Sequence, residues 1–327
     1  MIETISFPVY NESMAEYGGP EDLQNACRAL GCGGIEALWG GDTAMDTLPG
    51  NYAPGYHLTF YPDWVDFWRG DEVALLRKFG SRTAYESFYG GPGREALVAQ
   101  YRADLARAAR LGVRYVVFHV SDVSIEEGYT YRWEHSDKEV LDASIELVNL
   151  LFDGADYPFA LLVENQWWPG FTFTDPAKTN YLLDGIHHFN KGILLDTGHL
   201  MNANPALLTE ADGIAYIHKM LDEHGDLVRH IRGMHLHQSL SGPYVKANTG
   251  RLPGSMGGDY VARFGESYGH ILKIDQHRPW TDPAIAGIIK RIAPEVLTHE
   301  LSCKNRAERE RAVAAQRETL KRGGLYQ

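Results

Sequence analysis

The chain has 327 residues, 44% of them hydrophobic and 23% charged, and its formal net charge is -12. This composition is typical of a folded globular protein, and it argues against a disordered or a membrane protein. The acidic balance argues against a surface that attracts nucleic acid as a whole, and no apolar run reaches the roughly 18 to 20 residues that span a membrane.

Short β-rich runs alternate with longer amphipathic stretches from one end of the chain to the other. The alternation predicts eight strands, over residues 2–7, 34–38, 56–60, 114–120, 159–164, 192–196, 232–237 and 295–301. The clearest helices are predicted over residues 95–111, 137–152 and 305–321. Eight βα units in a chain of this length predict an α/β fold, a (β/α)8 TIM barrel that forms one domain over residues 1–327. A doubly wound open sheet is the alternative, but no GxGxxG turn follows the first strand.

Two long segments interrupt the alternation, residues 121–136 after the fourth strand and 239–270 after the seventh. In a barrel both would leave the C-terminal face, where active sites form, so we expect lids or oligomer arms. The oligomeric state stays open, with a homodimer as one alternative. The N-terminus lacks the basic and apolar regions of a secretory signal, so we expect a cytoplasmic protein.

Side chains that bind metals stand at the predicted carboxyl ends of the strands and in one further extended piece: His57, His119, Glu164, Asp196, His199, His235, His237, Asp275, His277 and Glu300. Each alone has an ordinary explanation, such as a helix cap or an ion pair. Gathered at one barrel mouth, they would repel one another or stay unsatisfied unless a cation lay between them. The pattern therefore predicts a site for divalent zinc, manganese, cobalt or iron.

The remaining cysteines, histidines and tryptophans are interpreted more simply. Cys27, Cys32 and Cys303 lack the close pairing of a zinc or redox motif, so we expect reduced thiols. We interpret as structural or exposed the histidines His187, His188, His218, His224, His230 and His299, and leave undecided His135 and His270. Indole rings at the rim could stack on a small substrate, and the candidates are Trp64, Trp68, Trp167, Trp168 and Trp280.

The order of the ligands along the chain resembles that of the xylose isomerase-like TIM-barrel superfamily, which includes sugar isomerases, sugar epimerases and endonuclease IV-like enzymes (AP endonuclease family 2). The most specific pieces are "LDTGH", "HLHQS" followed by "DQH", and "HEL". The isomerase branch implies one metal held by Glu164, Asp196, His235 and Glu300. Glu164 and Glu300 would also act as acid and base on opposite faces of a substrate carbon. His199 would contact substrate, and His237 is a second candidate for that contact.

The endonuclease IV branch implies three zinc ions and a longer set of ligands. The first ion would take His57, His119 and Glu164. The second would share Glu164 and take Asp196, His235 and Glu300. The third would take His199, Asp275 and His277. All nine positions carry a residue that can bind metal, which favours a site with several ions.

Two departures favour the isomerase branch instead. Endonucleases of this type show "HxNDSK" and "DTCH" where this chain has "HLHQSL" and "DTGH". No basic clusters interleaved with aromatics mark a duplex-binding surface. The sequence thus favours a metal-dependent isomerase or epimerase of a sugar, a sugar phosphate or a similar small polyhydroxylated molecule, holding one to three ions. A zinc phosphoester hydrolase is the first alternative, and a non-catalytic binding barrel and an iron-dependent oxidase are two more.

Overall fold

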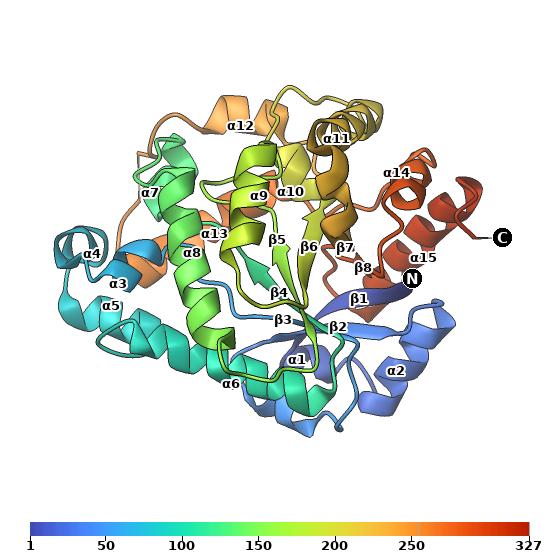
Figure 1. The fold of residues 1–327 in the computed structure, drawn as a ribbon, viewed down its shortest axis with the longest axis horizontal. Coiled ribbons are helices and arrows are strands. Elements are labelled where there is room, and N and C mark those ends of the chain that lie inside the picture. The colour runs from blue at the N-terminus through green and yellow to red at the C-terminus, as the bar shows by residue number, and fades with distance from the viewer. Residues whose placement is uncertain (255, 327) are drawn as a thin grey trace.

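A closed barrel of eight parallel strands stands at the centre of the molecule, in a computed structural model that describes residues 1–254 and 256–326 (Figure 1). The strands follow one another in chain order, and the first pairs with the last. They are β1 (Ile2–Val9), β2 (Gly34–Trp39), β3 (Gly55–His57), β4 (Tyr115–His119), β5 (Ala160–Glu164), β6 (Lys191–Asp196), β7 (Ile231–Leu236) and β8 (Val296–His299). The predicted TIM barrel is confirmed, and the open-sheet alternative is wrong.

The third strand is shorter than predicted. It ends at His57, whereas the sequence pattern extends to residue 60. The backbone N–H of Thr59 donates to the carboxylate of Asp104, at 2.8 Å, and not to a neighbouring strand. The chain therefore leaves the barrel just after His57, with that side chain at the mouth.

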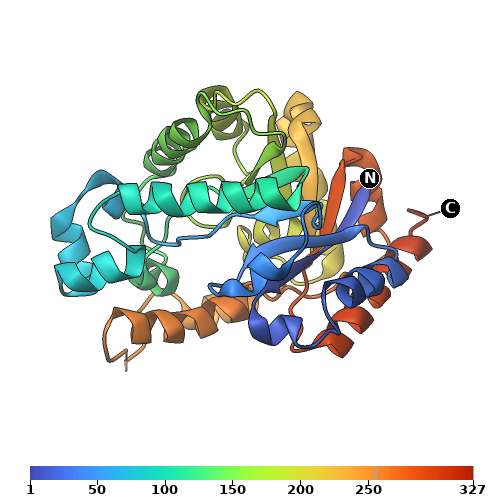
Figure 2. The ribbon, with the colours of Figure 1, turned by 90° about the horizontal axis from the view of Figure 1, so that it is seen from below.

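Helices cover the outside of the barrel (Figures 1 and 2). Their bounds are α1 (Asn11–Met14), α2 (Pro20–Ala29), η1 (Thr43–Thr47), α3 (Val65–Arg69), α4 (Glu72–Phe79), α5 (Arg82–Tyr89), α6 (Glu95–Leu111), α7 (Ile125–Thr130), α8 (Asp137–Phe152), α9 (Pro176–Gly185), α10 (Thr197–Asn202), α11 (Glu210–His224), η2 (Gly225–His230), α12 (Gly242–Asn248), α13 (Tyr260–Ile274), α14 (Ile285–Ile292) and α15 (Arg306–Arg322). Helices α6 and α8 match their predicted bounds, and α15 is shifted by one residue because Asn305 caps it. No described helix is long and apolar enough to cross a membrane.

The two predicted excursions carry helices of their own. Segment 121–136 contains α7, and segment 239–270 contains α12 and most of α13, with residue 255 outside the described part of the chain. The two excursions pack on each other, since Arg263 on α13 donates to Glu126 on α7 at 2.8 Å. His135 fixes the end of the first one, between Asp122 at 2.8 Å and Asp66 at 3.0 Å. The expected role of these segments as lids or oligomer arms stays a prediction.

A third excursion follows β3 and was not predicted. It carries α3, α4 and α5, and each of these helices ends at a glycine in the left-handed conformation, with φ of 70°, 81° and 80° at Gly70, Gly80 and Gly90. Residues with a Cβ adopt this conformation at a cost, so these glycines are ordinary helix stops. The three stops in the sequence were the signal that could have revealed the helices.

The inside of the barrel holds a small apolar layer below its mouth. The layer comprises Tyr115, Val117, Ala160, Leu162, Leu194 and Val296. Gly55 makes room for the Tyr115 ring, because a Cβ on Gly55 would lie 2.3 Å from the Cζ atom of Tyr115. A larger apolar core lies between the strands and the helices around them.

We predict that Gly55→Ala lowers the free energy of unfolding by about 1–3 kcal/mol, because the new methyl group overpacks the barrel interior. Urea unfolding followed by circular dichroism measures the change. Gly287→Ala is the matched control, since its Cβ would meet nothing within 4 Å and alanine favours a helix interior by about 0.5–1 kcal/mol. Equal stabilities of Gly55→Ala and the wild type would contradict the account.

Candidate metal centre

The alternation of side chains along each strand places the predicted ligands inside the barrel mouth. On β4, Tyr115 and Val117 belong to the inner apolar layer, and His119 is the next residue of the same face. On β5, the same step of two leads from Leu162 to Glu164. Because side chains alternate with a period of two, the last inward position of each strand meets its neighbours at the carboxyl end. An apolar floor thus lies beneath a polar layer.

The first cluster comprises His57, His119 and Glu164. The Nε2 atoms of the two histidines are 2.9 Å apart, and Glu164 Oε2 lies 3.3 Å from the first and 3.0 Å from the second. His57 Nδ1 lies 2.9 Å from the carbonyl oxygen of Leu58, which can only accept a hydrogen bond. The proton of His57 therefore lies on Nδ1, and the Nε2 lone pair faces the cluster, as in a metal ligand.

The second cluster shares Glu164 and adds Asp196, His235 and Glu300. His235 Nδ1 lies 2.7 Å from Glu300 Oε2, 3.4 Å from Glu164 Oε1 and 3.7 Å from Asp196 Oδ2. Among the described residues, His235 Nδ1, Glu164 Oε1 and Glu300 Oε2 are buried without a well-oriented hydrogen bond. Lone pairs that converge in this way fit a cation better than they fit one another.

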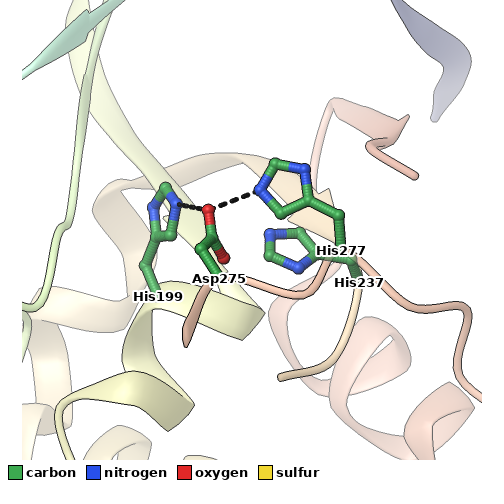
Figure 3. A group of neighbouring side chains, drawn as sticks. All are labelled: His199, His237, Asp275 and His277. Carbon is green, nitrogen blue, oxygen red and sulfur yellow. Dashed lines mark hydrogen bonds and ion pairs between the residues drawn. The ribbon is translucent and has the colours of Figure 1, made fainter. Parts of the chain in front are cut away.

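The third cluster lies beside the second and comprises His199, Asp275, His277 and His237 (Figure 3). Asp275 Oδ2 lies 3.2 Å from His199 Nε2 and 2.6 Å from His277 Nε2. The sequence predicts an extended segment around Asp275, and this prediction is wrong. Asp275 caps the end of α13, and His277 follows with a left-handed φ of 46°. The backbone turns there because Gln276 N donates to Ser239 Oγ at 2.9 Å.

The structure thus brings all nine predicted ligands together, in three groups whose ligand atoms lie within 4.8 Å of one another inside each group. Imidazole and carboxylate ligands in sets of three or four suit zinc, manganese, cobalt or iron. The residues present therefore fit the divalent cation that the sequence predicts.

Charges inside the centre shift the protonation of the ligands strongly. Burial raises the pKa of the Glu164 carboxyl, but His119 and His235 outweigh this effect and hold it well below the ordinary value. Burial lowers the pKa of His277, whereas the Asp275 carboxylate outweighs burial and raises it to about 9. The protonated imidazole of His277 thus pairs with Asp275 in the third cluster, and a bound metal would have to displace its proton.

Glu36, a residue that the sequence analysis missed, fixes the orientation of His235. His235 Nε2–H donates to Glu36 Oε1 at 2.9 Å, so its Nδ1 lone pair points at the second cluster. Glu36 Oε2 accepts hydrogen bonds from Tyr115 at 2.7 Å and Thr298 at 3.0 Å. The signal in the sequence was a single carboxylate inside the apolar run "GIEALW". A buried carboxylate behind a ligating histidine makes that histidine a stronger ligand.

The two polar residues that follow Glu164 position ligands of the second and third clusters. Asn165 exchanges hydrogen bonds with the backbone of Asp196, at 2.8 Å and 3.1 Å. Gln166 contacts His199 Nδ1 at 2.9 Å. The segment "ENQ" therefore supplies one ligand and positions two others.

The tryptophans expected at the rim divide into two groups. Trp167 packs on His199, with ring centres 5.1 Å apart, and Trp168 packs on Trp167 at 4.1 Å. Trp64 and Trp280 instead lie in the large hydrophobic core. Their indole nitrogens donate to Ser121 O at 2.9 Å and to Thr197 Oγ1 at 3.4 Å. That bond orients each of the two rings. All five of these tryptophans are buried, and Trp68 donates to Glu146. Their expected stacking on a substrate stays a prediction.

The other histidines and the cysteines lie apart from the three clusters. His299 points out of the barrel to Glu3 at 3.2 Å, and His224 bonds Thr179 at 2.9 Å. The undecided His270 is buried between Tyr244 and the backbone of Gly128. All three cysteines are free thiols.

Comparison with known families agrees with this geometry. A family model described as "Xylose isomerase-like TIM barrel" matches residues 25–322. The chain belongs to the xylose isomerase-like TIM-barrel family. A search among curated proteins finds no match.

Three solved structures to which the chain is similar align with nearly its whole length. A D-tagatose 3-epimerase-like protein is 16% identical with a TM-score of 0.48, over 99% of this chain and 98% of its own. Endonuclease IV from Thermus thermophilus is 16% identical with a TM-score of 0.48, over 98% and 100%. An IolI protein with a bound zinc atom is 13% identical with a TM-score of 0.49, over 98% and 96%.

We predict that Glu36→Gln weakens metal binding about 10–100-fold, because the neutral amide no longer strengthens His235 as a ligand. Competition with a chromophoric chelator measures the affinity. Glu127→Gln is the matched control, because Glu127 is a buried carboxylate that accepts from the backbone N–H of Ser124 and belongs to none of the possible metal groups, and it should leave the affinity unchanged. If the two variants bind metal equally well, Glu36 has no such role.

Proposed function

We propose that this chain is a divalent-metal-dependent hydrolase that cleaves a phosphoester of a small molecule with more than one metal ion. The observation that carries the proposal is the position of the Glu164 carboxylate. Its Oε2 atom faces His57 and His119 at 3.3 and 3.0 Å, and its Oε1 atom faces His199 and His235 at 3.1 and 3.4 Å. Both oxygens are engaged by separate ligand groups, as in a carboxylate that bridges two ions.

Clustered metal ions supply a hydroxide at neutral pH and neutralise charge on the leaving oxygen of a phosphoester. In this chain, the first cluster would hold one ion and the second cluster another. Glu164 belongs to both clusters and would contribute to both sites. Glu300, whose side chain is 14% exposed, is the member of the second cluster with the largest opening to solvent, because Glu164, Asp196 and His235 are fully covered. Substrate would therefore approach from the side of Glu300 and His119, the latter also 14% exposed.

A cavity of about 210 Å³ beside the first cluster indicates what the substrate carries. It lies between α7 and α13, and its lining is mostly apolar, including Phe60, Ile125, Tyr129, Trp168, Phe264 and Ile271. The Phe60 ring also touches the ring of His119, with centres 4.3 Å apart, so the cavity adjoins the metal ligands. An engineered cavity of about 150 Å³ binds benzene. The cavity thus suits an apolar group of one or two rings.

The same features favour a small molecule over nucleic acid. The lining of the cavity includes no lysine or arginine, and the chain carries a net charge of -12. Binding of a nucleic acid backbone depends largely on basic side chains that neutralise phosphates. We therefore propose an organic phosphoester with an aromatic or other apolar substituent.

Hydrolysis of model esters by the zinc-loaded chain tests the proposal. We predict metal-dependent release of 4-nitrophenolate from bis(4-nitrophenyl) phosphate, with a lower KM than for methyl 4-nitrophenyl phosphate because only the former fills the cavity. Asp196→Asn should lower kcat/KM about 100-fold or more by removing a ligand. Ser267→Trp, which fills the cavity, should raise the KM of the aryl diester alone. The absence of cleavage by fully loaded protein would refute the hydrolase.

An isomerase or epimerase is the second candidate, favoured by the composition of the second cluster. Glu164 and Glu300 both face the ion that Asp196 and His235 would share, so each could serve as acid or base for a substrate carbon. This reaction requires Glu164 to leave one of its imidazole partners and act with a free oxygen. Exchange of solvent deuterium into a sugar or sugar phosphate, lost in Glu300→Gln and without phosphoester cleavage, would favour this candidate.

A further inference from the structure

Two residues that differ from the repair-endonuclease pattern, Gly198 and His237, lie against each other. Gly198 is the second residue of α10. A Cβ placed on it would lie 2.0 Å from His237 Cε1 and 2.3 Å from His237 Nδ1. Both distances are far below van der Waals contact, and the obstacle is the body of a ring. The imidazole of His237 therefore occupies the space that a side chain at position 198 would need.

That imidazole belongs to the third cluster. The ligand atoms of His199, Asp275 and His277, together with one ring nitrogen of His237, lie within 4.8 Å of one another. The ring of His237 is fully buried, and its centre lies 4.1 Å from that of His277 (Figure 3). Its Nδ1 atom has no hydrogen-bond partner among the described residues. A buried imidazole with an unused nitrogen beside other ligands is a candidate ligand for a cation.

We propose that His237 is the fourth protein ligand of the metal ion held by His199, Asp275 and His277, and that Gly198 provides the space for it. The inference rests on the multi-metal centre of the proposed function and adds a ligand to it. Three imidazoles and one carboxylate suit zinc in tetrahedral geometry. With four protein ligands such a site is closed, as in structural zinc sites, whereas a catalytic zinc keeps one position open for water.

The closed site has a role different from that of its neighbours. A metal ion there would have no open position for an attacking water. It would join Asp275, at the C-terminus of α13, to His199 on α10. Helix α13 also lines the apolar cavity. The third site would therefore fix one wall of the substrate cavity relative to the first two clusters.

His237 also contacts the second cluster, and this contact defines the competing role. Its Nε2 atom lies 2.8 Å from Asp196 Oδ2. If His237 served only to orient Asp196, its loss would weaken the second site and leave the third unchanged. His237→Gln separates the two roles, because its longer amide reaches the position of Nε2 and can still donate to Asp196, whereas it leaves no nitrogen ligand at the position of Nδ1.

Metal binding without turnover tests the proposal. Zinc affinities and stoichiometry are measured by competition titration, and cobalt(II) absorption reports coordination number, since tetrahedral cobalt absorbs far more strongly than six-coordinate cobalt. His277→Asn identifies the signal of the third site. We expect His237→Gln to weaken that site about 10-fold or more and to remove its tetrahedral absorption, with the other sites unchanged. Gly198→Ala should do the same by displacing the ring.

The double variant and the controls make the outcome decisive. Gly198→Ala combined with His237→Gln should lose no more affinity than His237→Gln alone, because both act on one ligand. Gly287→Ala and His270→Asn should leave all sites intact, and thermal unfolding confirms that each variant is folded. His237→Asn, which loses the bond to Asp196 as well, should weaken both the second and the third site. An unchanged third site in His237→Gln, or a loss confined to the second site, would overturn the proposal. Failure of phosphoester cleavage alone would refute the proposed function and leave this result standing.

Discussion

The buried carboxylate of Glu164 is the constraint on which the mouth of this barrel depends. It is fully covered by protein, and four imidazoles from β3, β4, α10 and β7 surround its two oxygens. A charge at such a place costs several kcal/mol unless it is paired on every side. The charge on Glu164 therefore determines which groups can surround it. A cation between these groups would pair with all of them at once.

The rest of the barrel keeps this arrangement rigid. The apolar layer under the mouth packs β4, β5, β6 and β8 together, and Glu36, Tyr115 and Thr298 form a polar connection from that layer to His235. Ligands on strands are held more precisely than ligands on loops. The third cluster differs, because Asp275 and His277 come from the end of a helix and the turn after it. A metal ion there would join a peripheral helix to the barrel.

Much of this centre could be predicted from the sequence because strand ends follow a simple rule. A period-two pattern ending in His119 or Glu164 indicates both the strand and the direction of its last side chain. Strand order then brings such residues together without any knowledge of contacts. The predicted bounds of α6 and α8 matched for a similar reason, since each shows a regular apolar face and a clear end signal.

Other features depended on contacts between distant residues. The length of β3 is set by Asp104, some 45 positions further along the chain, and no local pattern contains that contact. The role of Glu36 follows only when β2 and β7 face each other across the barrel. Trp64 and Trp280 show the same limit, because an indole ring packs equally well in a core or at a rim. The Gly198–His237 contact joins two separate motifs, and its meaning became visible only in space.

The number of metal ions in the native protein tests the central claim most directly. The chain would be purified without added metal or chelator, and its metals counted by inductively coupled plasma mass spectrometry against the protein concentration. The account predicts at least two tightly bound divalent ions per chain, because Glu164 presents each of its oxygens to a separate ligand group. A single ion per chain that does not increase on saturation with zinc would contradict it.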